Sequence, residues 1–318
     1  MAETSGTGRK QVGGLVPIVA TPFDEAGQLD EDSLRSEVEY LIGAGVDGIT
    51  MFGVAGEFYA VTDQERIRGV RVAAEQAQGR VAVIAGTGHT GTEVAAYLSS
   101  RAADAGADAV MVIMPFFIRP DAAGVRAYCA AVATAAGIPV MIQDQPHTSG
   151  VNLPIPLLTQ IAKETPLCTL FKIETPAPVG KIAELVKAVR AEGLESAVLG
   201  GMAGVHLLEE MEVGSRGTMP ASLMPEVYGS VWRAFRHGEI DTARQLFDRY
   251  FPIIRLTNQP GMGPRMVKLL LQRAGVIKTT YTRGPAPPLD SSTERALLQT
   301  AERLDLWAIM AGKQSPSA

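Results

Sequence analysis

Lys172 is the residue whose surroundings most suggest chemistry. The chain has eight lysines, and Lys172 alone lies inside an apolar, strand-like run, at 169–174. Alternation along a strand places Lys172 and Glu174 on one face and the aromatic Phe171 on the other. If the aromatic face meets surrounding helices, the amine points into the sheet's interior, where burial disfavours the ammonium and leaves a free nucleophile. The alternative is a lysine at a strand end that extends into water.

The remaining basic residues and the histidines do not suggest a second centre. Lys268 also lies in an apolar stretch, but the pattern there is helical, and one lysine per helical turn is ordinary. The histidines lack the spacing of metal ligands, so we predict no catalytic metal. His147 follows a strand-like run and is a candidate for proton transfer.

A glycine turn, Gly53-Val54-Ala55-Gly56-Glu57, directly follows another apolar run. Successive backbone N–H groups in such a turn can bind an anion, and a substrate carboxylate would fit. The alternative is a tight connection in which the glycines serve only geometry. We expect Glu57 to brace the loop rather than to move protons.

Eight short apolar runs alternate with amphipathic patterns and would position these residues. Such runs are typical of parallel strands covered by helices. The pattern predicts an α/β fold, a (β/α)8 TIM barrel over residues 12–237, with an open doubly wound sheet as the alternative. The predicted strands are 15–21, 48–52, 81–85, 109–114, 139–143, 169–173, 197–199 and 217–219.

Helix signals support this alternation. Helical patterns occur at 31–43, 63–78, 93–105 and 177–191. Thr62 and Thr92 stand where helix N-caps belong, and glycines at 45, 106 and 137 stand where helices end. Three later patterns, 239–256, 263–274 and 292–311, predict a C-terminal helical extension over residues 238–312.

In barrels, polar residues that follow the strands form the site, because catalytic groups gather at the carboxyl ends of the strands. Gln143 and Lys172 are therefore the candidate catalytic residues. The candidate substrate-binding residues are Thr21, Gly53, Val54, Ala55, Gly56, Phe117, His147, Glu174, Gly200, Gly201 and Thr218. The loops at Gly200-Gly201 and Thr218 could hold phosphate, but they carry no basic residue beyond Arg216.

Composition limits the class of partner. The net charge is −5 and the estimated pI is about 5.5, which argues against nucleic acid or an anionic membrane. The longest apolar run, 109–118, is half the length of about 20 residues that spans a bilayer.

Segment 1–11 is polar and lacks the apolar stretch of a signal peptide. With only two cysteines, far apart, the expected location is the cytoplasm.

Several anchors, in order along residues 12–306, resemble the dihydrodipicolinate synthase and N-acetylneuraminate lyase superfamily of Schiff-base barrels. The resemblance implies that Lys172, at the end of the sixth strand, forms an imine with a 2-oxo acid substrate. It also implies a homotetramer and no cofactor. The anchors are segments 20–23, 53–57, 85–88, 106–108, 115–117, 171–174 and 214–217.

Several residues differ from those of the synthases, and these differences limit which reaction we expect. Gln143 stands where the synthases have a tyrosine, Phe117 replaces a second tyrosine, and Thr148 replaces a carboxylate-binding arginine. Val54 and Ala55 replace two threonines. The usual proton relay is therefore missing. Segments 143–150 and 171–176 are similar to the L-2-keto-3-deoxyarabonate dehydratase branch, although that branch lacks the Gly-x-x-Gly-Glu form of 53–57.

We therefore expect a lyase that dehydrates a 2-keto-3-deoxy sugar acid through an imine at Lys172. A pyruvate-dependent aldolase is the first alternative, and a non-catalytic sugar-acid binder is the second. Gln143 cannot be a general base near neutral pH. Tyr59, His147, Glu174 and a bound water remain as proton carriers, and we expect a water or the substrate's own groups, positioned by Gln143, to serve.

Overall fold

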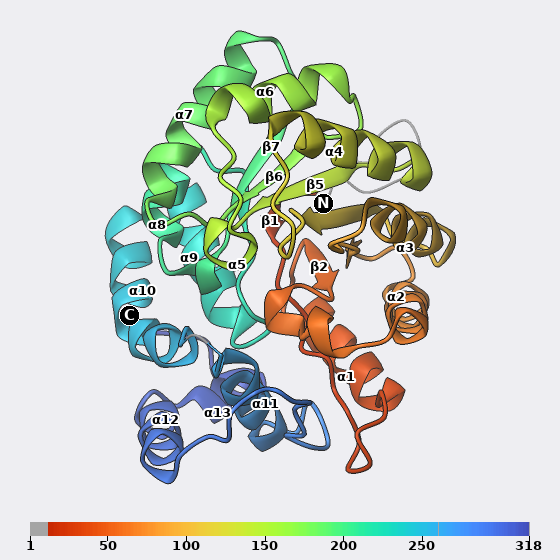
Figure 1. Cartoon of the computed structure of the whole chain (residues 1–318). Coiled ribbons are helices and arrows are strands. Elements are labelled where there is room, and N and C mark those ends of the chain that lie inside the picture. The colour runs from red at the N-terminus through yellow and green to blue at the C-terminus, as the bar shows by residue number, and fades with distance from the viewer. Residues whose placement is uncertain (1–11, 260, 318) are drawn as a thin grey trace.

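A computed structural model describes residues 12–259 and 261–317. Segment 1–11, where we expect no signal peptide, lies outside these residues. Within them, eight parallel strands form one sheet with helices around it (Figure 1). The strands are β1 (Gly14–Leu15), β2 (Gly48–Met51), β3 (Ala82–Gly86), β4 (Ala109–Ile113), β5 (Val140–Asp144), β6 (Leu170–Ile173), β7 (Ala197–Gly200) and β8 (Gly217–Thr218).

The sheet closes on itself. Each strand from β2 to β8 pairs with the next, and β8 pairs with β1. A parallel bridge between Ile18 and Thr50 joins the remaining edges, with the Thr50 N–H donating to Pro17 O at 2.8 Å. The predicted (β/α)8 barrel is confirmed. The first strand is shorter than predicted because Pro17 lacks an N–H, which interrupts its ladder.

Two apolar layers form the core. Inside the barrel lie residues such as Ile84, Met141 and Leu199. Alternate strand residues, such as Phe171 and Val198, face outward and pack under the helices. This alternation decides which side chains reach the barrel's mouth, because every second residue of a strand faces inward.

The helices surround the barrel in sequence order. The N-cap predicted at Thr62 is confirmed and forms a capping box with Glu65, whereas Thr92 is not an N-cap. Thr92 is already helical and Gly91 caps the helix without a side-chain bond. The helices are α1 (Glu31–Gly43), α2 (Asp63–Ala77), α3 (Thr92–Asp104), α4 (Ala122–Ala136), α5 (Pro146–Ser149), α6 (Ile155–Glu164), α7 (Pro178–Ala191), α8 (Leu207–Glu212) and α9 (Pro225–Arg236).

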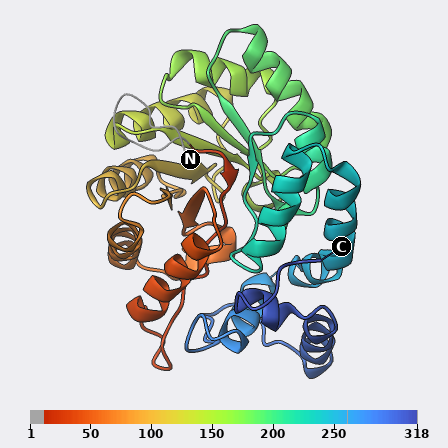
Figure 2. The same cartoon turned by 180° about the vertical axis from the view of Figure 1, so that it is seen from behind.

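Four helices follow in the part of the chain that the structure describes, and Figure 2 shows the last three beside α1 at one end of the molecule. They are α10 (Ile240–Thr257), α11 (Gly263–Arg273), α12 (Ser291–Arg303) and α13 (Leu306–Met310). The single helix predicted at 292–311 is wrong, because Asp305 is left-handed (φ 53°). In one helix Leu304 and Leu306 would lie about 200° apart around the axis, and the break allows both to be buried.

Among the described residues, no helix combines the length and the apolar character needed to cross a bilayer.

Candidate active site

Lys172 faces the inside of the barrel near the carboxyl end of β6. Leu170, two residues earlier, belongs to the barrel's interior cluster, so Lys172 shares that inward direction. Only 3% of Lys172 is exposed, and its Nζ lies 3.2 Å from Oε2 of Glu174. The neighbouring strand places Gln143 directly opposite Lys172 in register. The structure thus brings together the two predicted catalytic residues and Glu174.

Glu174 is the centre of this cluster. Its Oε2 accepts a 2.6 Å hydrogen bond from Nε2 of Gln143, and its Oε1 accepts a 2.8 Å bond from the Met202 N–H. Burial raises the pKa of Glu174, but the charge of Lys172 opposes this effect. With the two N–H donors, that charge holds the pKa below its usual value, so the group is a carboxylate at neutral pH.

The pair Gly200-Gly201 accommodates two carboxyl groups, one on each face of the strand end. A Cβ on Gly201 would lie 2.5 Å from Cγ of Glu174, inside the barrel. A Cβ on Gly200 would collide with the carboxyl group of Glu210 on the outer face. The space beside these glycines is therefore filled by the protein's own carboxyl groups. The negative charge of Glu174 does not favour the phosphate site that we considered for this loop.

Glu210 was missed by the sequence analysis. It lies on α8, is 1% exposed, and its two oxygens have no hydrogen-bond partner among the described residues. Burial and the nearby charge of Glu174 raise the pKa of Glu210 to about 8. A proton on Glu210 at neutral pH avoids a second buried negative charge behind Glu174. Nothing in the pattern around 207–212 distinguishes it from a surface glutamate.

The glycine turn crosses the mouth of the barrel as the 3-10 turn η1 (Val54–Gly56). Ala55 packs on the interior cluster, and Thr21 donates its hydroxyl to the Gly56 carbonyl. The N–H groups of Val54 and Ala55 open the turn and so have no partner within it. Two backbone N–H groups of the turn are therefore left for other acceptors, and their binding of a carboxylate stays a prediction.

Lys268 differs from the sequence expectation. We expected an ordinary helical lysine, but it is 0% exposed and forms an ion pair with Glu57, which is also 0% exposed. The expectation was wrong because nothing near Lys268 in sequence reveals its partner in a distant loop. The prediction that Glu57 braces its loop agrees with this contact.

Three other candidates are not gathered around Lys172. Phe117 is 85% exposed on the loop after β4, and His147 is exposed on α5. Tyr59, the remaining proton-carrier candidate, is 47% exposed. A fourth candidate, Thr218, is fully buried on β8 and forms no hydrogen bond with Lys172, whose ion pair is with Glu174. Of the side chains considered as proton carriers, only Glu174 lies beside the lysine.

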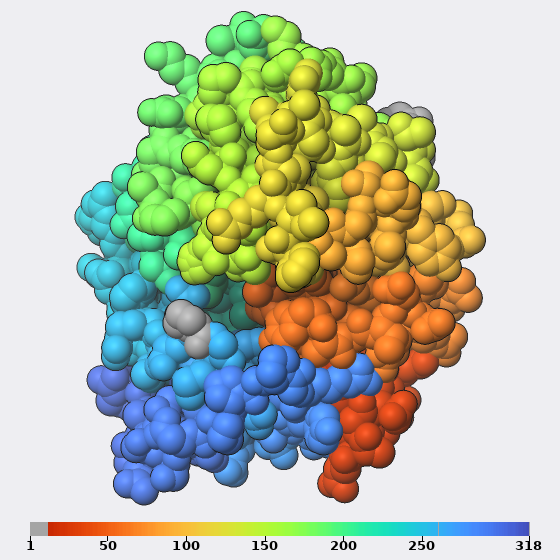
Figure 3. Space-filling model, viewed as in Figure 1, coloured from red at the N-terminus to blue at the C-terminus, as the bar shows by residue number. Residues whose placement is uncertain are grey.

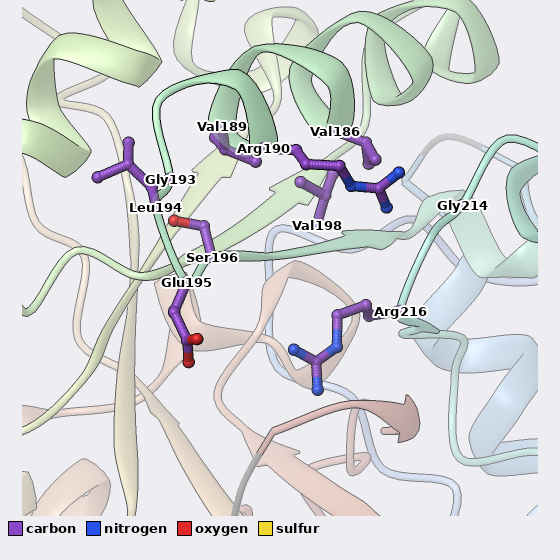
Figure 4. A pocket seen from close by; sticks show the side chains of 10 residues that line it. All are labelled: Val186, Val189, Arg190, Gly193, Leu194, Glu195, Ser196, Val198, Gly214 and Arg216. Atoms are coloured by element: carbon purple, nitrogen blue, oxygen red, sulfur yellow. The ribbon is translucent and has the colours of Figure 1, made fainter.

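The surface is hollowed at this end of the barrel. Figure 3 shows the hollow between the yellow-green segment around α5, the orange segment that includes η1, and the blue C-terminal extension. A different cavity, of about 400 Å³, lies at the opposite ends of β7 and β8, lined by Arg190 and Arg216 among others (Figure 4). Barrel chemistry occurs at the carboxyl ends of strands, which favours the first hollow.

Among residues 12–259 and 261–317, no three His, Cys, Asp or Glu side chains are grouped so that they could hold a metal ion. The expectations of no catalytic metal and no cofactor remain predictions.

With this geometry established, comparison with known proteins identifies the family. Residues 11–304 match the model of the Dihydrodipicolinate synthetase family. The chain belongs to this family. It is accordingly a lyase of the dihydrodipicolinate synthetase type, and the resemblance drawn from the sequence anchors is confirmed.

Relatives within the family carry two different activities. The chain is 34% identical over 295 residues to L-2-keto-3-deoxyarabonate dehydratase of Azospirillum brasilense, covering 92% of this chain and 94% of that protein. It is 30% identical over 290 residues to 4-hydroxy-tetrahydrodipicolinate synthase of Maridesulfovibrio salexigens, covering 89% and 95%. At these identities the family and the lyase class are shared, while the substrate differs between the relatives.

Solved structures in the family have the same fold. One is YagE, a prophage protein of E. coli K12 in complex with pyruvate, which superimposes with a TM-score of 0.86 at 28% identity. The match covers 92% of this chain and 99% of that one.

Proposed function

We propose that this protein dehydrates a 2-keto-3-deoxy sugar acid through an imine between Lys172 and C2 of the substrate. The observation that carries the proposal is the buried cluster of Lys172, Glu174 and Gln143 at the carboxyl ends of β5 and β6. An amide in place of the synthase tyrosine, and the 34% identity to a sugar-acid dehydratase, support dehydration over synthase chemistry.

Imine formation follows from the position of the lysine. Glu174 takes a proton from the Lys172 ammonium, and the free amine attacks the C2 carbonyl to give a carbinolamine. Glu174 then returns this proton to the carbinolamine hydroxyl, which leaves as water and gives a protonated imine. The N–H groups of Val54 and Ala55 hold the C1 carboxylate. No cofactor is required, because the imine itself accepts the electron pair released at C3.

Glu174 is the proton carrier that we propose. Its carboxylate takes a proton from C3, and the C–H electron pair forms the C2–C3 double bond of an enamine. The enamine then expels the C4 hydroxyl, to which Glu174 returns the proton, and water leaves. Hydrolysis of the resulting unsaturated imine frees Lys172. The 3.2 Å separation of Glu174 from Nζ and its ionised state support this role over the exposed His147 and Tyr59.

An aldolase is the second candidate. The same imine can accept electrons from cleavage of the C3–C4 bond, which releases pyruvate. Relatives that are 4-hydroxy-tetrahydrodipicolinate synthases and the pyruvate complex of a structural neighbour favour it.

The test is a panel of 2-keto-3-deoxy sugar acids, beginning with L-2-keto-3-deoxyarabonate. Mass spectrometry should show a product lighter by one water, and coupling to lactate dehydrogenase should detect no pyruvate. Pyruvate release would establish the aldolase instead. Thermal stabilisation by a sugar acid without any product over hours would indicate the non-catalytic binder. Glu174→Gln should still form the imine but turn over about a hundredfold more slowly or worse.

We also propose a cytoplasmic homotetramer that acts on small molecules and binds neither nucleic acid nor membrane. The family resemblance supports the assembly, and the exposed apolar residues Phe117 (85%) and Ile118 (73%) offer surface that a partner subunit could cover. Cys129 and Cys168 are free thiols, as in a reducing compartment. Light scattering during gel filtration gives the subunit number.

A further inference from the structure

We propose that Lys268, in the C-terminal extension, is a positioning residue that acts through Glu57 to hold the carboxylate-binding turn 53–56 in its working conformation. The proposal rests on the proposed function, since the turn is taken to bind the substrate's C1 carboxylate. It makes the extension a part of the active site, because Lys268 would act on the substrate-binding turn through Glu57.

Three groups of the protein surround the buried ammonium of Lys268. Its ammonium contacts the Glu57 carboxylate and donates a 2.8 Å hydrogen bond to the Tyr281 carbonyl. The Phe23 ring covers it, with Nζ 4.5 Å from the ring centroid. Lys268 and Glu57 are both 0% exposed, so each ion's principal compensation for lost hydration is the other.

Glu57 is the residue at which the turn ends. Its backbone is left-handed (φ 56°, ψ 36°), a conformation that is uncommon for a residue with a side chain. The Glu57 N–H closes η1 by donating to the Val54 carbonyl. The carboxylate that Lys268 holds therefore belongs to the residue that fixes the far end of the turn.

The turn is restrained from two sides. Thr21, after β1, donates to the Gly56 carbonyl, and a Cβ on Gly56 would lie 2.8 Å from the Val19 carbonyl, so the turn lies close against the first strand segment. From the other side, α11 supplies Lys268. Burial raises the pKa of Glu57 and the charge of Lys268 opposes this effect, so without Lys268 the carboxyl group would take up a proton or turn toward solvent. Either change would loosen the alignment of the Val54 and Ala55 N–H groups.

A matched control exists in the same extension. Lys278 also reaches the barrel side, where it pairs with Asp32 at 2.9 Å and with Asp30 at 3.5 Å, but it is 60% exposed and its ion pairs do not involve the turn. Lys278→Met therefore removes a lysine–carboxylate contact between extension and barrel without touching Glu57.

The experiment compares wild type, Lys268→Met, Glu57→Gln, Lys268→Met/Glu57→Gln and Lys278→Met in two assays. The first is borohydride trapping over a range of pyruvate concentrations, read by mass spectrometry, together with kcat and KM for turnover. Lys268→Met should raise KM and the half-saturating pyruvate concentration by about tenfold or more, while kcat changes much less, as expected for lost ground-state binding. Lys278→Met should match wild type.

The double variant should recover part of the affinity, because removing the second charge relieves the unpaired carboxylate. Wild-type pyruvate dependence in Lys268→Met would overturn the proposal, and so would an equal loss in Lys278→Met. If Lys268→Met does not fold, Glu57→Gln, which keeps the size of the side chain, gives the same comparison.

The second assay needs no substrate. Hydrogen exchange of a peptide spanning 52–62 should be faster in Lys268→Met than in wild type or Lys278→Met. Unchanged exchange there overturns the positioning role whatever the protein's reaction. If exchange is faster but wild type itself forms no adduct with any 2-oxo acid, the turn is held by Lys268 and the proposed function fails instead.

Discussion

The side-chain amide of Gln143 donates a 2.6 Å hydrogen bond to Oε2 of Glu174. This oxygen also faces Nζ of Lys172 at 3.2 Å. Gln143 cannot carry protons, but its N–H donor helps to hold the pKa of Glu174 below the usual value and directs the carboxylate toward the lysine. Gln143, which replaces the synthase tyrosine, is therefore not a base itself. It positions the base, Glu174.

Gln143→Leu tests this relationship through the pH dependence of the reaction. Loss of the donor should raise the pKa of Glu174, so its carboxylate protonates at higher pH. The acid limb of kcat/KM should move upward, by about one pH unit if the bond is worth the usual amount for a charged acceptor. Gln145→Leu is the control, since Gln145 contacts the Gln143 amide at 3.4 Å and not the carboxylate. An acid limb at the wild-type position would contradict the assignment.

Gly201→Ala should displace Glu174. The added Cβ would lie 2.5 Å from Cγ of Glu174, closer than non-bonded carbons approach, so the carboxylate must shift. A displacement of about 1 Å at a catalytic group can cost a hundredfold in rate, and we expect a loss of that order in kcat. Gly180→Ala, on α7 with no atom near the added Cβ, should leave the rate unchanged. Circular dichroism checks that both variants fold.

Glu210→Gln should change how stability depends on pH. The folded-state pKa of Glu210, about 8, is raised above the unfolded value near 4.5, so its favourable contribution is complete below about pH 4.5 and is lost as pH rises to 8. In that window wild type should lose up to about 1.4 kcal/mol per pH unit relative to the variant. Urea unfolding of both proteins at several pH values measures the difference. If the free energy of unfolding changes with pH in the same way for wild type and Glu210→Gln, Glu210 is ionised in the folded protein.

Much of the barrel could be predicted because its strands are apolar on both faces. That pattern identified all eight, and the lone strand lysine identified Lys172. The ends of the strands and helices were predicted less accurately, since Pro17 shortens β1 and Thr92 is not an N-cap. The break at Asp305 could not be foreseen, because it depends on how Leu304 and Leu306 are buried against the rest of the fold.

The surroundings of the lysine were harder to predict than the lysine itself. Glu210 and Lys268 look like surface residues on helices, since their burial arises only in the tertiary structure. Lys268 pairs with Glu57, more than two hundred residues earlier, and no local pattern encodes that contact. The two consecutive glycines at 200 and 201 are explained by a carboxyl group on each side, a relationship that exists only in the tertiary structure.

Imine formation at Lys172 is the central claim, and reductive trapping tests it most directly. The protein is incubated with pyruvate and borohydride, digested, and its peptides are analysed by mass spectrometry. We predict one reduced adduct, on the peptide that contains Lys172, and none on that peptide in Lys172→Arg, whose turnover should fall to background. An adduct confined to another lysine, or undiminished turnover in Lys172→Arg, would contradict the account.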